Sequence, residues 1–329
     1  KEIGFGHLHR CLNLAEELKK NFQITFVCRY FNSSNLKLIK KKKFKLLVLK
    51  IKNKNFNQDQ DARETINNLH TNFDLAIVDH YKLGFKWEKI LSRSIKKIMV
   101  IDDYLNKKHF CNIILNYNHA VKKKIYKKYF LPKTSFLVGS KYIIINKKYL
   151  KVRRDKTKPL KILIFLGTDN KYTTKKLIKL LDQNLMLENK FEVVLTKGIT
   201  GFNDQLRYIK KFKNCNVYFG LPDLSNIISK SQIGIISGGQ IVNECLVLGI
   251  PTIVFSTAKN HEKSCKFLQK HRLINFMGNF NKDKKIFFLY TLRKLLKNRR
   301  FRNNQSKNLK NIVDGKGVKR IADYLYNEI

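Results

Sequence analysis

The stretch Gly4-Phe5-Gly6-His7, which runs directly into Leu8-His9-Arg10-Cys11-Leu12, decides how the rest of the chain is interpreted. Two glycines allow a tight turn and a close approach of the backbone to a ligand. Apolar residues recur at helical spacing from Leu8 to Leu18, so a helix is predicted to begin at about His7. The His7 imidazole would then lie at the positive end of a helix, where free N–H groups attract phosphate and the dipole favours a neutral base. The alternative is a glycine turn before an ordinary amphipathic helix.

The composition is that of a globular, strongly basic chain whose 329 residues suggest two domains. Its 68 lysines and arginines outnumber 24 acidic residues, and the net charge of +44 suggests nucleic acid or an anionic membrane as a partner. The basic residues are scattered through every segment, so we favour a compositional drift and expect no nucleic-acid partner. The same positive field would attract an anionic nucleotide.

The six cysteines indicate a reducing compartment rather than a disulfide framework. They show neither CxxC nor zinc-ligand spacing, so we expect buried thiols, no metal site and no cofactor. No stretch reaches the ~18 apolar residues of a membrane span, and no signal peptide is visible. A cytoplasmic protein is therefore predicted, with an oligomeric state that the sequence does not indicate. The chain begins directly before the glycine stretch, so the strand that usually precedes such a stretch is expected to be missing.

Short apolar strands alternate with helices along the whole chain, which predicts parallel α/β sheets. In the first half, strands are expected over 23–28, 44–51, 73–79, 97–101 and 113–116. In the second half, they are expected over 160–166, 191–195, 216–219, 233–236 and 252–255, with 259–262 in a loop.

This order predicts a GT-B-like architecture of two Rossmann-type α/β domains that face a central cleft. We expect an N-terminal domain over residues 1–150 and a C-terminal domain over residues 159–312. The charged segment 147–158 is interpreted as the linker, and residues 313–329 as a helix that packs back on the N-terminal domain.

Polar residues gather where the strands of the first half end, which is the edge where parallel sheets concentrate their chemistry. These residues are Asp79, His80, Tyr81, Asp102, Asp103 and Asn116. Taken singly, each also fits a helix cap or a turn. Their shared position at the edge of His7 favours a site.

A second glycine turn, Ser237-Gly238-Gly239, follows a strand and precedes a helix, so its backbone N–H groups can hold a diphosphate. Glu244 lies on the same helix and can accept both hydroxyls of a ribose. The alternative is a surface glutamate placed favourably for the helix dipole. Neither glycine turn carries the Walker lysine or the GxGxxG fingerprint, so these sequences exclude both motifs.

Several motifs in order resemble one known family. They are Ile3-Gly4-Phe5-Gly6-His7, Arg10-Cys11-Leu12, Val78-Asp79-His80-Tyr81, Ile101-Asp102-Asp103, Gly139-Ser140-Lys141-Tyr142, Gly167 with Asp169, Ser237-Gly238-Gly239 with Glu244, Leu248-Gly249-Ile250-Pro251-Thr252, Asn260 and Asp314-Gly315. Together they cover nearly the whole chain and resemble the UDP-2,4-diacetamido-2,4,6-trideoxy-β-L-altropyranose hydrolases of pseudaminic acid biosynthesis, which have the GT-B nucleotide-sugar fold.

The resemblance implies metal-independent, inverting hydrolysis of a UDP-sugar at its anomeric carbon, with release of UDP. His7 matches the catalytic histidine of the family, which activates the attacking water. The substrate-binding positions implied are Gly6, Arg10, His80, Tyr81, Gly167, Asp169 and Asn260, and those for UDP are Ser237, Gly238, Gly239 and Glu244. A GT-B glycosyltransferase that uses a UDP-sugar donor is the alternative. Two departures from the family pattern, the shorter turn Gly167-Thr168-Asp169 and His261 after Asn260, bear on the choice of sugar.

Overall fold

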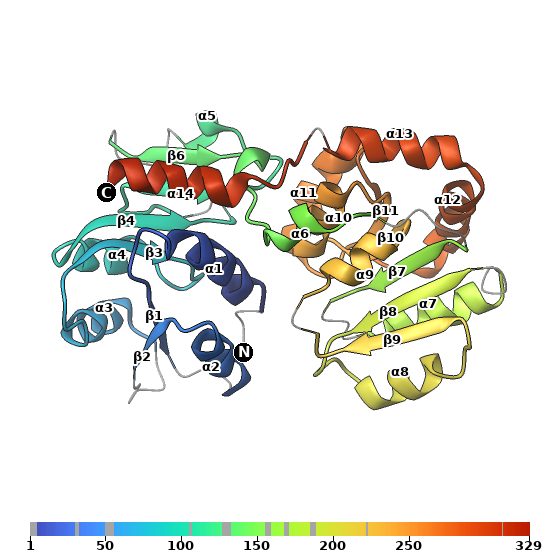
Figure 1. The fold of residues 1–329 in the computed structure, drawn as a ribbon, viewed down its shortest axis with the longest axis horizontal. Coiled ribbons are helices and arrows are strands. Elements are labelled where there is room, and N and C mark those ends of the chain that lie inside the picture. Colours follow the sequence, from blue (N-terminus) through green and yellow to red (C-terminus); the bar gives the residue numbers. More distant parts are fainter. Residues whose placement is uncertain are drawn as a thin grey trace. The chain divides into compact units, whose positions relative to one another are not determined.

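The chain forms two compact α/β units (Figure 1). The computed structural model describes residues 5–29, 33–49, 56–104, 107–126, 133–154, 159–167, 171–184, 189–221, 223–310 and 312–329. The first unit consists of Lys1–Ile145 with Lys316–Ile329, and the second of Asn146–Gly315. Within the described part of the chain, no helix is both long and apolar enough to cross a membrane.

The first unit contains two parallel sheets. One pairs β1 (Thr25–Arg29) with β2 (Lys45–Leu49), and the other has the order β3 (Phe73–Val78), β4 (Ile95–Ile101), β5 (Ile113–Asn116) and β6 (Ser135–Val138). Its helices are α1 (Phe5–Leu18), α2 (Ser33–Lys41), α3 (Gln58–Asn67), α4 (Phe85–Leu91), α5 (Lys123–Tyr126), the short 3-10 helix η1 (Ser140–Tyr142) and α14 (Gly317–Glu328).

Helix α1 is fixed on two sides because its apolar residues form two stripes. Leu8 and Leu12 pack with Phe44 and other residues of the β1–β2 layer. Leu14 and Leu18 belong to a separate core with residues of β4, β5 and α14. The first turns of α1, which carry His7 and Arg10, therefore have a defined position in this unit.

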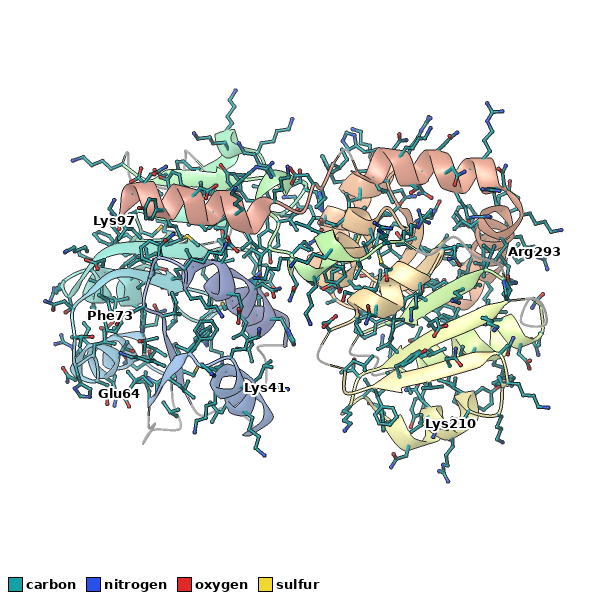
Figure 2. The ribbon with its side chains drawn as sticks, viewed as in Figure 1. Lys41, Glu64, Phe73, Lys97, Lys210 and Arg293 are labelled. Carbon is teal, nitrogen blue, oxygen red and sulfur yellow. The ribbon has the colours of Figure 1, made fainter. Side chains whose placement is uncertain are left out.

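Helix α14 lies across the first unit beside α1 (Figure 1). Its first residue, Gly317, approaches the chain so closely that a Cβ there would overlap the carbonyl oxygen of Ile143. At its other end, Lys97 of β4 donates to the carboxylate of Glu328 at 3.2 Å (Lys97 is labelled in Figure 2). The helix is thus tied to the unit at both ends.

The second unit is built on one parallel sheet of six strands. Their order is β12 (Asn275–Gly278), β11 (Thr252–Phe255), β10 (Ile233–Ser237), β7 (Lys161–Phe165), β8 (Lys190–Leu195) and β9 (Cys215–Phe219). Its helices are α6 (Lys148–Lys151), α7 (Thr173–Asp182), α8 (Phe202–Ile209), α9 (Ser225–Lys230), α10 (Gln240–Leu248), α11 (Lys259–Lys270), the 3-10 helix η2 (Lys282–Lys284), α12 (Lys285–Lys297) and α13 (Arg299–Lys310). This is the doubly wound order, in which the direction of winding reverses between β7 and β10.

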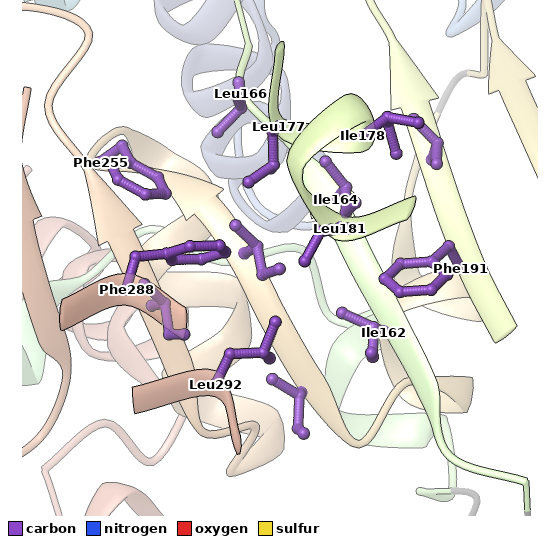
Figure 3. Close-up of a cluster of buried hydrophobic side chains, with 14 of the residues drawn as sticks. Ile162, Ile164, Leu166, Leu177, Ile178, Leu181, Phe191, Phe255, Phe288 and Leu292 are labelled. Atoms are coloured by element: carbon purple, nitrogen blue, oxygen red, sulfur yellow. The ribbon is translucent and has the colours of Figure 1, made fainter. Parts of the chain in front are cut away.

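The core of the second unit lies between this sheet and helices α7 and α12 (Figure 3). Ile162 and Ile164 of β7 point to the same side as Phe191 of β8, as strand alternation requires. Phe288 of α12 packs on Phe255 of β11, with ring centroids 5.6 Å apart. The continuous apolar strands read from the sequence are therefore buried, as in other parallel sheets.

Two expected segments differ in the structure. Residues 259–262, expected as a loop, form the first turn of α11. The segment 147–158 is not only a linker, because Lys148–Lys151 form α6 and the Tyr149 ring is buried in the second unit. In both places charged residues obscured the helical pattern in the sequence. Residues 155–158 lie outside the described ranges.

Candidate active site

The two residues that define the candidate site are His7, in the first turn of α1, and Asp79, which follows β3. His7 Nδ1 lies 2.5 Å from Oδ1 of the buried Asp79 carboxylate. A carboxylate only accepts hydrogen bonds, so Nδ1 carries the proton, and when the ring is neutral Nε2 presents its lone pair. Arg10 Nη2 lies 3.1 Å from the same Nδ1, but two donors do not bond, and we interpret this as a close approach. The pair is therefore arranged as an oriented base.

Arg10 fixes the carboxylate that orients His7. Its Nε donates to Asp79 Oδ2 at 2.6 Å and its Nη2 to Asp79 Oδ1 at 2.5 Å. The same guanidinium donates to both oxygens of Asp103 at 2.8 and 2.9 Å, and to the hydroxyl of Tyr117 at 2.9 Å. Such two-pronged pairs are the strongest and most directional hydrogen bonds that proteins use. Arg10 is buried, so a change of its geometry would displace both carboxylates.

Asp79 stays ionised in this environment. Burial alone would raise its pKa, but the charge and hydrogen bonds of Arg10, together with the bond from His7, outweigh burial and hold the pKa well below its usual range. The carboxylate is consequently available at neutral pH to stabilise a proton on His7.

Tyr81 closes one side of the imidazole. Its ring meets that of His7 edge to face, with centroids 4.5 Å apart, and its hydroxyl donates to Asp103 Oδ2 at 3.0 Å. Desolvation and the nearby Asp103 charge raise the pKa of Tyr81, which keeps it a neutral donor. The adjacent His80 turns toward Phe56, at 6.3 Å between ring centroids, and accepts from the amide of Lys82. Desolvation lowers the pKa of His80.

The polar strand ends do meet at one edge, but they divide into two groups. Parallel pairing of β3, β4 and β5 brings Asp79 and Asp103 to the guanidinium of Arg10. Asp102 and Asn116 instead accept from backbone N–H groups two residues further on, as turn residues do. The sequence motif alone does not separate these two groups.

The glycine stretch also differs from its expected form. Helix α1 begins at Phe5, so Gly6 and His7 lie inside its first turn and not in a loop before it. A Cβ at Gly6 would meet nothing within 4 Å among the described residues. Gly4 lies outside the described ranges.

The second unit carries a glycine-lined turn at its switch point. Gly167 follows β7 and has a φ of 64°, and a Cβ there would lie 3.3 Å from Ser237 Oγ. Gly238 and Gly239 follow β10 and lead into α10, with Gly239 as the N-cap residue. Three of the expected UDP positions and Gly167 therefore lie at the carboxyl ends of two neighbouring strands, the usual place for ligands in this fold.

His261, a residue that the motifs did not assign to the site, packs on this turn. A Cβ at Gly238 would lie 2.9 Å from His261 Cβ, and a Cβ at Gly239 would lie 3.7 Å from His261 Nε2. The helical spacing of α11 places His261 against the turn. A loop over 259–262 would not predict this contact. Asn260 is the second residue of the same helix, with its side chain outside the description, and Asp169 lies outside the described ranges.

Glu244 has a partner that the sequence did not indicate. Its Oε2 accepts from the hydroxyl of Tyr149 in α6 at 2.9 Å. Desolvation raises the pKa of Glu244 to about 7, against the hydrogen bond from Tyr149, and the negative charge of Asp223 adds to the rise. In a buried environment, hydrogen bonds from hydroxyl donors are stronger than in water and would favour the ionised form of this carboxyl.

Comparisons with known proteins agree with the fold and with the motifs. No family model matches the chain. The UDP-2,4-diacetamido-2,4,6-trideoxy-beta-L-altropyranose hydrolase of Campylobacter jejuni is 27% identical over 82% of this chain and 93% of its own length. The spore coat polysaccharide biosynthesis protein SpsG of Bacillus subtilis is 23% identical over 98% of this chain and 94% of its own length.

Solved structures show the same architecture at low identity. MurG of Acinetobacter baumannii has a TM-score of 0.66 at 14% identity, over 98% of this chain and 96% of that one. The UDP-GlcNAc 2-epimerase of Neisseria meningitidis has a TM-score of 0.58 at 13% identity, over 98% and 97% of the two chains. The chain has the GT-B fold, and its resemblance to the UDP-2,4-diacetamido-2,4,6-trideoxy-β-L-altropyranose hydrolases is confirmed.

Proposed function

We propose that the protein hydrolyses a UDP-linked 2,4-diacetamido-2,4,6-trideoxy sugar at its anomeric carbon, releasing UDP and the free sugar, as a step of pseudaminic acid biosynthesis. The observation that carries the proposal is the hydrogen bond between His7 Nδ1 and Asp79 Oδ1. It leaves Nε2 as the atom that takes a proton, and a carboxylate stabilises the imidazolium that results.

In the proposed reaction, Nε2 of His7 removes a proton from a water molecule as its oxygen attacks the anomeric carbon. The bond from that carbon to the diphosphate oxygen breaks, and its electron pair leaves with UDP. The new hydroxyl takes the face opposite the diphosphate, so the configuration inverts. Arg10 holds Asp79 in position throughout, and we class it as a positioning residue. Tyr81 limits where the sugar contacts the imidazole.

We assign the nucleotide to the second unit. Backbone N–H groups of the turn Ser237-Gly238-Gly239 and the start of α10 would bind the diphosphate, as helix N-termini commonly do. His261, packed on that turn, would add a donor to the same phosphates. Glu244 would accept the ribose hydroxyls. Because the diphosphate oxygen is weakly basic and departs as an anion without first being protonated, the reaction needs little help from a general acid.

Transfer of the sugar to an acceptor is the second candidate function, since the solved relatives include glycosyltransferases such as WaaG. The glycine turn and Glu244 serve either reaction. An oriented base beside a tyrosine favours attack by water. Incubation with the UDP-sugar alone separates the two, because only a hydrolase releases UDP at a sustained rate without an acceptor.

The decisive variant is His7→Asn, assayed with a panel of UDP-diacetamido sugars whose products are identified by mass spectrometry and NMR. We expect loss of turnover by about 10³-fold with UDP affinity unchanged, because the base is removed and the nucleotide site is not. The matched control is His70→Asn, at an exposed histidine of the same unit, which should behave as wild type. Wild-type turnover by His7→Asn would refute the base assignment.

A further inference from the structure

Helix α12 presents an apolar patch to solvent. Ile286 is 83% exposed, Phe287 56% and Tyr290 63%, and their spacing places them on one face of the helix. The opposite face buries Phe288 and Leu292 in the core of the second unit (Figure 3). Single exposed hydrophobic residues are common, but a contiguous group on one helical turn usually marks an interaction surface.

The surroundings of this patch are cationic. Helices α12 and α13 together contain nine lysines and arginines and no acidic residue, four in α12 and five in α13. Arg293, labelled in Figure 2, and Lys297 are exposed and continue the stripe of Ile286 and Tyr290 along the helix. The outer face of α12 is thus apolar in its first turns and positively charged in its last ones.

We propose that this face of α12 binds the surface of an anionic membrane. Ile286 and Phe287 would enter the boundary between headgroups and acyl chains, and Tyr290 would lie at headgroup depth. Arg293 and Lys297 would contact lipid phosphates, with their aliphatic stems on the apolar side. The association is peripheral. Part of the net charge of +44 would then bind anionic lipid at this face.

Charge selects this partner over two others. A second copy of the chain would bring the same cations against each other, which opposes pairing of two α12 faces. Nucleic acid would satisfy the cations but would leave Ile286 and Phe287 without apolar contact. An anionic bilayer satisfies both parts of the face.

The test is flotation of the whole protein with vesicles of equal parts phosphatidylglycerol and phosphatidylcholine, compared with phosphatidylcholine alone. We expect binding to the anionic vesicles only, weakened by salt. The triple variant Ile286→Ser, Phe287→Ser, Tyr290→Ser should lose affinity by about tenfold or more, because the apolar contribution is removed. Its control is Tyr326→Ser with Ile329→Ser, two exposed hydrophobic residues of the first unit. Circular dichroism and thermal melting check that each variant is folded.

A charge variant, Arg293→Gln with Lys297→Gln, should also reduce binding to anionic vesicles. Its control, Lys210→Gln with Lys211→Gln at two exposed lysines directly after α8, should not (Lys210 is labelled in Figure 2). Two vesicle results would overturn the proposal: no binding of the wild type to anionic vesicles at low salt, or wild-type affinity in the triple variant. The proposal would also be overturned if light scattering showed an oligomer of the wild type and a monomer of the triple variant. If the wild type binds RNA but no vesicles, and the triple variant binds RNA equally well, the cations would be assigned to nucleic acid instead.

Discussion

His7 Nδ1 and Asp79 Oδ1 lie 2.5 Å apart although 72 residues separate them in the chain. The contact depends on two independent pieces of local structure, the start of α1 and the end of β3. Arg10, one turn after His7 on α1, donates to both oxygens of the same carboxylate. A helix and a strand end thereby fix one ring nitrogen and leave the other for chemistry.

Asp79→Asn should therefore lower kcat by about 10³- to 10⁴-fold with little change in UDP affinity. An amide presents one oxygen where the carboxylate presents two, so its NH2 group would face either Arg10 Nε or the position where His7 Nδ1 and Arg10 Nη2 share one acceptor, and it does not stabilise an imidazolium. Steady-state kinetics and calorimetric titration with UDP measure the two quantities. The control is Asp74→Asn, at an exposed carboxylate paired with Lys96. An unchanged kcat would show that His7 does not depend on Asp79.

Much of the fold could be predicted because most strands are short apolar runs that stand out in the sequence. The expected strand over 233–236 matches β10 within a residue, and the helix expected after the turn Ser237-Gly238-Gly239 is α10. The elements β6, α8, β12, α12 and α13 were not predicted. Strands β6 and β12 and helix α8 span only four to eight residues, and α13 is almost entirely polar. In α12, apolar residues lie on both faces, with Phe288 buried and Ile286 and Phe287 exposed, so its sequence shows no clear division into a buried and a polar face.

The position of the candidate site could be predicted from the sequence, but the contacts between its residues could not. Strand ends and glycine turns locate it, because parallel strands share an edge. Which of two adjacent carboxylates reaches Arg10 depends on local backbone direction: Asp103 binds Arg10, and Asp102 accepts from a turn amide. Tyr149 reaches Glu244 from a segment that looked like a linker, and no local pattern connects them.

With Glu244 as the proposed acceptor of the ribose hydroxyls, we expect its raised pKa to make nucleoside binding depend on pH. Only the ionised carboxylate accepts two ribose hydroxyls, so affinity for uridine should rise with pH up to about 7 and then level off. Below that point, the Kd should increase by up to roughly tenfold per pH unit, as the ionised fraction falls. Uridine is the proper probe because it has no phosphate that titrates in this range. Calorimetry checks this, and Glu244→Gln should bind weakly at every pH. A Kd that is flat from pH 5 to 8 in the wild type would remove Glu244 from the ribose.

Tyr149→Phe should move that pH dependence upward. The Tyr149 hydroxyl donates to Glu244 Oε2 and lowers the pKa of the carboxyl. Without this bond, the midpoint of uridine binding should rise by about one pH unit, the equivalent of one hydrogen bond to a charged group. The matched control is Tyr326→Phe, at an exposed tyrosine of α14. A midpoint that stays in place or falls would show that Tyr149 does not act on the carboxylate.

Gly317→Ala should destabilise the first unit by more than about 2 kcal/mol, because rigid backbone offers no room for the methyl group. The added Cβ would overlap the carbonyl oxygen of Ile143 and lie 2.7 Å from its amide nitrogen, so α14 would have to withdraw from η1. That movement would also strain the contacts of Ile321 and Leu325 with the core that holds α1. Urea denaturation, followed by circular dichroism, measures the free energy of unfolding. Gly84→Ala is the control, since its Cβ would approach nothing closer than 3.8 Å among the described residues. Equal stability of the two variants would mean that α14 does not depend on the close approach at Gly317.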